Sequence, residues 1–104
     1  MEPSHKSLQC LTQLLDLPDA DYWSDVASCD ARAILDRGGE QILREIWNGL
    51  ASWPSLRQQH LAYVLGESNV AIEIQMLSRL ASSEIPDVAS TALESLRSAM
   101  ARNA

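Results

Sequence analysis

Several residue types that commonly stabilise small proteins are scarce in this chain. Its 104 residues include no phenylalanine, four glycines, four prolines and only two cysteines. Leucine, isoleucine, valine, alanine and three tryptophans must therefore fill the core. A single domain of this size, here residues 1–104, buries about 60–70% of the surface of its unfolded chain, so it needs neither a disulfide nor a structural metal.

The two cysteines and the apolar segments exclude several classes of protein. Cys10 and Cys29 do not form the closely spaced pair typical of metal or redox sites, and we expect two small buried thiols. No apolar stretch approaches the roughly 20 residues that a membrane-spanning helix needs. The N-terminus has no basic region followed by an apolar run, so we expect no secretory signal. These absences predict a cytoplasmic protein with reduced thiols and no cofactor.

Positive charge is scarce too. Eight basic residues face 14 acidic ones, which gives a formal net charge of −6. Such a surface repels phosphate backbones and anionic membranes, so we expect neither nucleic acid nor a membrane as a partner. A basic protein would be attracted. The same charge is equally explained by an acidic surface that only keeps the protein soluble.

The apolar pattern predicts an all-α fold. Apolar residues recur at spacings of three and four, and no segment alternates with a period of two. Gly38-Gly39 breaks the pattern, Pro54 and Pro86 each suit the first position of a helix, and Gly66 suits the residue after one. The helices are expected at residues 5–16, 19–37, 40–51, 54–65, 69–81 and 86–102.

The second half of the chain repeats an earlier part at an interval of about 30 residues. Pro54 then aligns with Pro86, and Leu61 aligns with Leu93. Short loops make consecutive helices antiparallel neighbours. The repeat predicts three antiparallel hairpins stacked side by side, and a non-repeating six-helix bundle is the alternative.

The last hairpin resembles a HEAT repeat over residues 73–97. An apolar helix is followed by Pro86-Asp87-Val88-Ala89, then by Ala92-Leu93 and Leu96. The basic residue usual in the second helix of that repeat has an equivalent only in Arg97. The resemblance implies a HEAT-like α-solenoid.

A narrower resemblance covers residues 35–97. Ile46-Trp47, Trp53 and the run from Gln58 to Gly66 are similar to small bacterial immunity proteins that occur beside polymorphic or contact-dependent toxins. The resemblance implies a non-enzymatic inhibitor that binds and occludes one cognate toxin. A general HEAT-like adaptor or assembly protein is the alternative, and a small lyase represents a third class.

An acidic stretch with no basic residue is the first candidate for the partner-binding site. Its members are Asp16, Asp19, Asp21, Tyr22, Trp23, Asp25 and Asp30. Aromatic side chains ringed by acids suit a protein–protein interface, and here they suit the basic active-site cleft of a toxin. In the alternative interpretation, Asp19 caps a helix, Asp21 complements its dipole and the aromatic rings pack inward.

The second candidate lies on the expected fourth helix. Arg57, Gln58 and Gln59 lie opposite its apolar stripe, and the second helices of stacked hairpins often line a concave binding surface. A solvated polar face is the alternative. We expect His60 to be a core histidine with one hydrogen-bond partner.

The remaining motifs indicate packing rather than chemistry. We expect Trp47, Trp53 and Tyr63 to pack between hairpins. The apolar face of the second helix is expected to comprise Tyr22 or Trp23, Val26, Cys29, Ala33 and Ile34. No nucleophile elbow, zinc-binding helix or glycine-rich phosphate loop is recognisable, so we expect no catalytic and no metal-binding residues. The chain is expected to be a monomer or a weak homodimer.

Overall fold

The computed structural model describes residues 3–18, 22–66 and 71–103, and every regular element within these ranges is helical. The all-α prediction is therefore confirmed for the described chain. A π-helical turn, η1, precedes the longest helix, and a 3₁₀ turn, η2, follows it. The elements are α1 (Pro3–Leu15), η1 (Trp23–Ala27), α3 (Ser28–Gly49), η2 (Leu50–Ser52), α4 (Ser55–Val64), α5 (Ala71–Ala81) and α6 (Pro86–Asn103).

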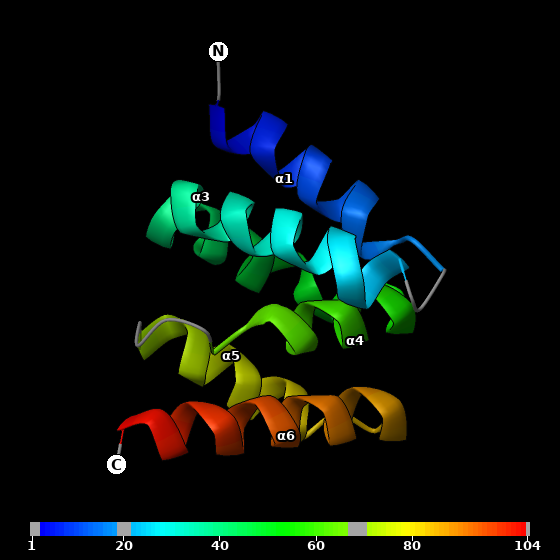
Figure 1. Cartoon of the computed structure of the whole chain (residues 1–104), viewed down its shortest axis with the longest axis vertical. Coiled ribbons are helices and arrows are strands. Elements are labelled where there is room, and N and C mark those ends of the chain that lie inside the picture. Colours follow the sequence, from blue (N-terminus) through cyan, green and yellow to red (C-terminus); the bar gives the residue numbers. More distant parts are fainter. Residues whose placement is uncertain (1–2, 19–21, 67–70, 104) are drawn as a thin grey trace.

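The helices follow one another along the long axis of the molecule (Figure 1). α1 lies at one end and packs against α3, while α6 lies at the other end and packs against both α4 and α5. α4 also contacts α1 and α3, so it lies between the two ends of the molecule. The described chain therefore forms one continuous helical stack.

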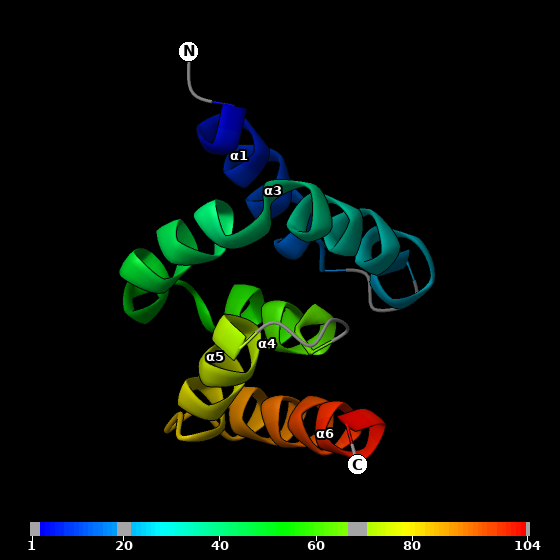
Figure 2. The same cartoon turned by 90° about the vertical axis from the view of Figure 1, so that its left-hand side faces the viewer.

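α3 bends sharply at Gly39, where φ is 60° and ψ is −150° (Figure 2). Only glycine adopts this backbone region readily. The sequence predicted two helices separated by Gly38-Gly39. In the structure α3 spans both predicted helices, so the described residues contain five α-helices where the sequence predicted six. The predicted break is confirmed as a non-helical backbone at Gly39 inside α3.

The prolines and the glycine that were expected at helix ends lie close to their predicted positions. Pro86 is the first residue of α6, and Pro54 directly precedes α4 in an extended conformation. Gly66 follows the end of α4 with a φ of 90°. A Cβ atom added there would lie 3.0 Å from Leu77 Cδ1 and 3.4 Å from Ala99 Cβ. Gly66 is thus required both by its conformation and by the close approach of α5 and α6.

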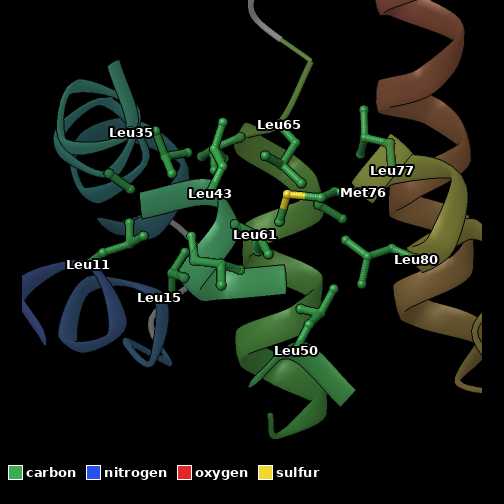
Figure 3. Packing of buried hydrophobic residues seen from close by; sticks show 14 of the residues in the cluster. Leu11, Leu15, Leu35, Leu43, Leu50, Leu61, Leu65, Met76, Leu77 and Leu80 are labelled. Atoms are coloured by element: carbon green, nitrogen blue, oxygen red, sulfur yellow. The ribbon is translucent and has the colours of Figure 1, made fainter. Parts of the chain in front are cut away.

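Aliphatic side chains fill the core between the helices (Figure 3). Leu61 of α4 is completely buried in the centre, between side chains of α1 and α3 on one side and of α5 on the other. Burying a leucine contributes about 1.5–3 kcal/mol, so this layer dominates the stability of the stack. The labelled core residues are Leu11, Leu15, Leu35, Leu43, Leu50, Leu61, Leu65, Met76, Leu77 and Leu80.

The buried face of the η1–α3 segment differs from the predicted one. Val26 is 44% exposed, and Cys29 and Ala33 are exposed as well. The small residues Ala27 and Ala31 are instead completely buried. They allow the close approach of neighbouring helices, which a pattern weighted towards large apolar side chains does not reveal. The expectation of buried thiols is also wrong, because Cys10 is exposed like Cys29.

Candidate partner-binding groove

At the candidate site, an ion pair joins two helices that are far apart in the sequence. Arg32 of α3 donates hydrogen bonds of 2.8 and 2.7 Å to the two carboxylate oxygens of Glu73 in α5. Glu73 is only 1% exposed, and the side chain of Arg32 is 14% exposed. Asp36, one turn further along α3, accepts two more hydrogen bonds from Arg32. The guanidinium is therefore hydrogen-bonded to two carboxylates.

The same pair holds the end of α4. Arg32 Nη1 donates to the carbonyl oxygen of Val64 at 2.9 Å, and Glu73 Oε1 accepts a hydrogen bond of 2.9 Å from the Gly66 amide. The Val64 carbonyl is one of the last in α4, which have no partner inside the helix, and the Gly66 amide lies just beyond the helix end. On the opposite side, Ser95 of α6 donates to the carbonyl oxygen of Ala62 at 2.7 Å. α3, α5 and α6 thus fix the C-terminal end of α4.

Burial and neighbouring charges act in opposite directions on the pKa of Arg32. Burial of the guanidinium lowers the pKa of Arg32, but the hydrogen bonds and negative charges of Glu73 and Asp36 outweigh it and raise this pKa. Arg32 is therefore always charged, and its charge is neutralised locally.

A groove of about 600 Å³ opens above this junction. It lies where the first half of α3, the end of α4 and the middle of α6 meet. The first half of α3 and the end of α4 lie on the right-hand side of Figure 2. Its volume is within the range of about 300–1,000 Å³ that is common for ligand pockets. The lining includes Cys29 and Arg32 from α3, Tyr63 and Leu65 from the end of α4, and Glu94 and Ser98 from α6.

The groove is electronegative. Among the described residues of its lining, Arg32 is the one basic side chain, and Glu73 and Asp36 already neutralise it. Glu94 is exposed in the groove and pairs with no basic side chain of the described residues. Asp30 is also exposed, directly after the groove residue Cys29. Excess negative charge in a concave surface attracts cations.

Exposed apolar and aromatic side chains occur in the groove and on the segment that precedes α3. Tyr63 in the lining is 48% exposed, and its ring is tilted against that of Trp23 at a centroid distance of 6.1 Å. Tyr22 is 48% exposed, and Val26, one turn further along, is 44% exposed. Partly exposed tyrosines are enriched among the residues that dominate binding energy at protein interfaces.

Trp23 contacts both His60 and Tyr63 through its ring. The ring of His60 stacks on that of Trp23 with a centroid distance of 4.2 Å and an interplanar angle of 11°. His60 Nδ1 donates a hydrogen bond of 2.8 Å to the carbonyl oxygen of Leu15, which fixes the tautomer. Burial lowers the pKa of His60, and the Leu15 carbonyl and the charge of Asp16 oppose this shift only in part. The expectation of a core histidine with one hydrogen-bond partner is confirmed.

The members of the acidic stretch lie in different surroundings. Asp19 and Asp21 are outside the described residues, and so is the side chain of Asp25. Tyr22 and Asp30 are exposed. Trp23 is only 4% exposed, as in the interpretation that packs the aromatic ring inward. A partner could therefore contact Tyr22 directly, whereas Trp23 supports the surface.

Arg57 pairs with Asp16, the first residue of the acidic stretch. It donates hydrogen bonds of 2.9 and 2.8 Å to the two carboxylate oxygens of Asp16. This hydrogen bonding raises the pKa of Arg57. Its guanidinium also lies 5.1 Å from the ring centroid of Trp53. Gln58 donates to the carbonyl oxygen of Trp53 at 2.7 Å, and Gln59 is half-buried.

None of the residues that line the groove belongs to the predicted site. Tyr63 was expected to pack between hairpins, and Glu94 was not singled out. Glu94 lies in the middle of α6, and the packing of α6 against α4 brings it into the same groove as Tyr63. Trp47, also expected to pack, is 36% exposed, and the Arg79 guanidinium lies 4.7 Å from its ring centroid.

Searches for relatives and for other site types give no further assignment. No protein-family model, curated protein or solved structure matches the chain. Among the described residues, no group of three or more histidine, cysteine, aspartate or glutamate side chains could hold a metal ion. No helix in that part of the chain is long and apolar enough to cross a membrane.

Proposed function

We propose that this chain is an immunity protein, which neutralises a bacterial toxin by binding it and covering its active site. The observation that carries the proposal is the electronegative groove at the α3–α4–α6 junction, with Tyr63 in its lining and Tyr22 exposed on the adjoining segment. Aromatic side chains supply binding energy, and the acidic surroundings steer a basic partner. We place this action in the bacterial cytoplasm.

We further propose that the helices form a HEAT-like solenoid of three hairpins. The contacts of α4 with α6 support this proposal, since second helices of adjacent hairpins stack in such a solenoid. The contacts of α3 with α5 support the corresponding stacking of first helices. The predicted hairpin boundary within α3 coincides with the kink at Gly39.

The inhibitor acts by occlusion and needs no reaction of its own. A toxin with a basic substrate cleft would meet a surface that carries a net negative charge and is held in shape by the buried Arg32–Glu73 pair. A preorganised surface loses little conformational entropy on binding, which strengthens the complex. Charge complementarity mainly raises the association rate, so added salt slows association more than it speeds dissociation.

The proposal is tested by co-expression with the product of the adjacent gene. An immunity protein restores the growth of cells that make this product, and it co-purifies with it. Tyr63→Ala is expected to weaken rescue, whereas Met100→Ala, which removes an exposed side chain outside the groove, leaves it intact. Absence of both rescue and co-purification overturns the proposal. Co-purification without any effect on the product's activity supports the adaptor alternative instead.

A further inference from the structure

We infer that the groove binds a short segment of the protein partner through one arginine side chain of that partner, placed between Tyr63 and Glu94. This inference rests on the proposed function, because it names the chemistry that the partner presents to the groove. It concerns a surface that lies largely outside the predicted acidic stretch.

The negative charge of the groove favours a cationic side chain of the partner. At this junction Arg32 pairs with the carboxylates of Glu73 and Asp36, and Glu94 lines the same groove as Arg32. The first two carboxylates are hydrogen-bonded to Arg32. Glu94 is left as an exposed carboxylate with no basic partner among the described side chains. An incoming cation is therefore expected to pair with Glu94.

The shape and the aromatic residue favour arginine over lysine. A planar guanidinium can stack on the exposed ring of Tyr63 and can also donate two parallel hydrogen bonds to a carboxylate. A lysine ammonium offers only a point charge. The fold already contains two such contacts, Arg57 over Trp53 and Arg79 over Trp47. The chemistry that we assign to the partner is thus of the kind this chain uses internally.

The groove has room for more than one side chain. Its volume of about 600 Å³ exceeds that of a single arginine side chain, so neighbouring residues of the partner segment can enter as well. Thr91 and Ser98 contribute hydroxyl groups to the lining, and these can hydrogen-bond to the backbone of the segment.

Cys29 provides a built-in reporter of occupancy. Its thiol is exposed and lines the groove, whereas the exposed thiol of Cys10 lies on α1 outside it. A segment bound in the groove therefore shields Cys29 from alkylation and leaves Cys10 reactive. The two thiols form a matched pair within one molecule.

The test uses a short alanine- and glutamine-based peptide with one central arginine, and the same peptide with citrulline, the neutral isostere. Only the arginine peptide is expected to slow alkylation of Cys29 relative to Cys10 and to shift the amide resonances of Tyr63 and Glu94. Citrulline is expected to weaken binding about tenfold, which is typical for loss of a charged hydrogen-bonding partner. Equal binding of the two peptides, or no protection of Cys29 by either, overturns the inference.

Two variants separate this inference from the proposed function. Glu94→Gln is expected to abolish the preference for arginine over citrulline, and Glu40→Gln, the same change outside the groove, is expected to retain it. If the neighbouring gene product is inhibited equally by the wild type and by Glu94→Gln, the groove assignment is wrong while the proposed function stands. If that product is never bound but the arginine peptide is, the proposed function fails and the groove assignment stands.

Discussion

Arg32 and Glu73 are 41 positions apart in the sequence, yet two hydrogen bonds of 2.8 and 2.7 Å join their side chains. This pair connects α3 to α5 and also binds the backbone at the end of α4. It therefore couples three helices at the point where the groove opens. The groove keeps its shape because this junction is buried and fully hydrogen-bonded around the guanidinium.

Replacing Arg32 with methionine is expected to destabilise the protein strongly. The change leaves the carboxylate of Glu73 buried without its cation, which typically costs about 3–5 kcal/mol. Urea denaturation measures the loss as a lower midpoint with an unchanged slope. Arg44→Met is the matched control, because Arg44 pairs with Glu40 only at the surface, and its effect should stay below about 1 kcal/mol.

The double variant Arg32→Met/Glu73→Met checks the reason for that loss. Replacing both buried charges with apolar side chains of similar size is often neutral or stabilising. The double variant is therefore expected to recover most of the stability that Arg32→Met loses. A double variant no more stable than the single one would contradict this explanation.

The kink in α3 predicts opposite effects for two glycine-to-alanine changes. Gly39→Ala forces a side chain into a glycine-only backbone region and is expected to cost about 1–3 kcal/mol. Gly49→Ala meets nothing closer than 3.8 Å at a φ of −107°, so it should be neutral or stabilise by up to about 1 kcal/mol. Thermal unfolding of the two variants makes the comparison. Equal destabilisation by both would mean that the backbone of Gly39 is not the cause.

The lowered pKa of His60 predicts that the protein loses stability in mild acid. Burial lowers its pKa in the folded protein, whereas the unfolded chain titrates at the ordinary value of 6.5. The unfolded state therefore binds more protons as the pH falls below 6.5, and the free energy of unfolding decreases from there down to the pKa of the folded state. Urea denaturation at a series of pH values measures the slope.

Variants of the two histidines show which residue causes the pH dependence of the free energy of unfolding. His60→Gln is expected to flatten the slope, even though it also lowers the overall stability by removing the stacking with Trp23. His5→Gln, a change at the other histidine of the sequence, measures in parallel what that residue contributes. If His60→Gln keeps the full pH dependence, another group is responsible.

A double-mutant cycle on Asp16 and Arg57 is expected to give a small coupling energy. The pair is bidentate, but the Asp16 side chain is 45% exposed, so solvent screens the interaction. Such pairs contribute about 0.2–1 kcal/mol, and this coupling should shrink in high salt. Asp16→Asn, Arg57→Gln and the double variant complete the cycle. A coupling that is large and insensitive to salt would show that the pair is shielded from water.

The local signals in the sequence predicted most helix positions. Pro86 begins α6, Gly66 follows α4 in a left-handed conformation, and Gly39 bends α3. These residues act through their own backbone preferences, so their effect can be predicted without the tertiary structure. The helix count differs because α3 spans both predicted helices, although Gly39 between them has a non-helical backbone.

The groove was not predictable, since it depends on which helices meet. Glu94, Tyr63 and Arg32 come from three separate helices, and no spacing in the sequence relates them. The buried face of η1 and α3 was misassigned for a similar reason. Ala27 and Ala31 are completely buried because neighbouring helices approach them closely, while the larger Val26 is exposed. Small side chains give only a weak hydrophobic signal, although they permit the closest packing.

The proposed inhibition is tested most directly by titration of the neighbouring gene product's activity with this chain. Occlusion by an immunity protein predicts that activity falls linearly and reaches its minimum at one chain per enzyme molecule. It also predicts that more of this chain is needed at high salt, since charge speeds association. Activity that stays constant up to a large excess of the chain would contradict the account.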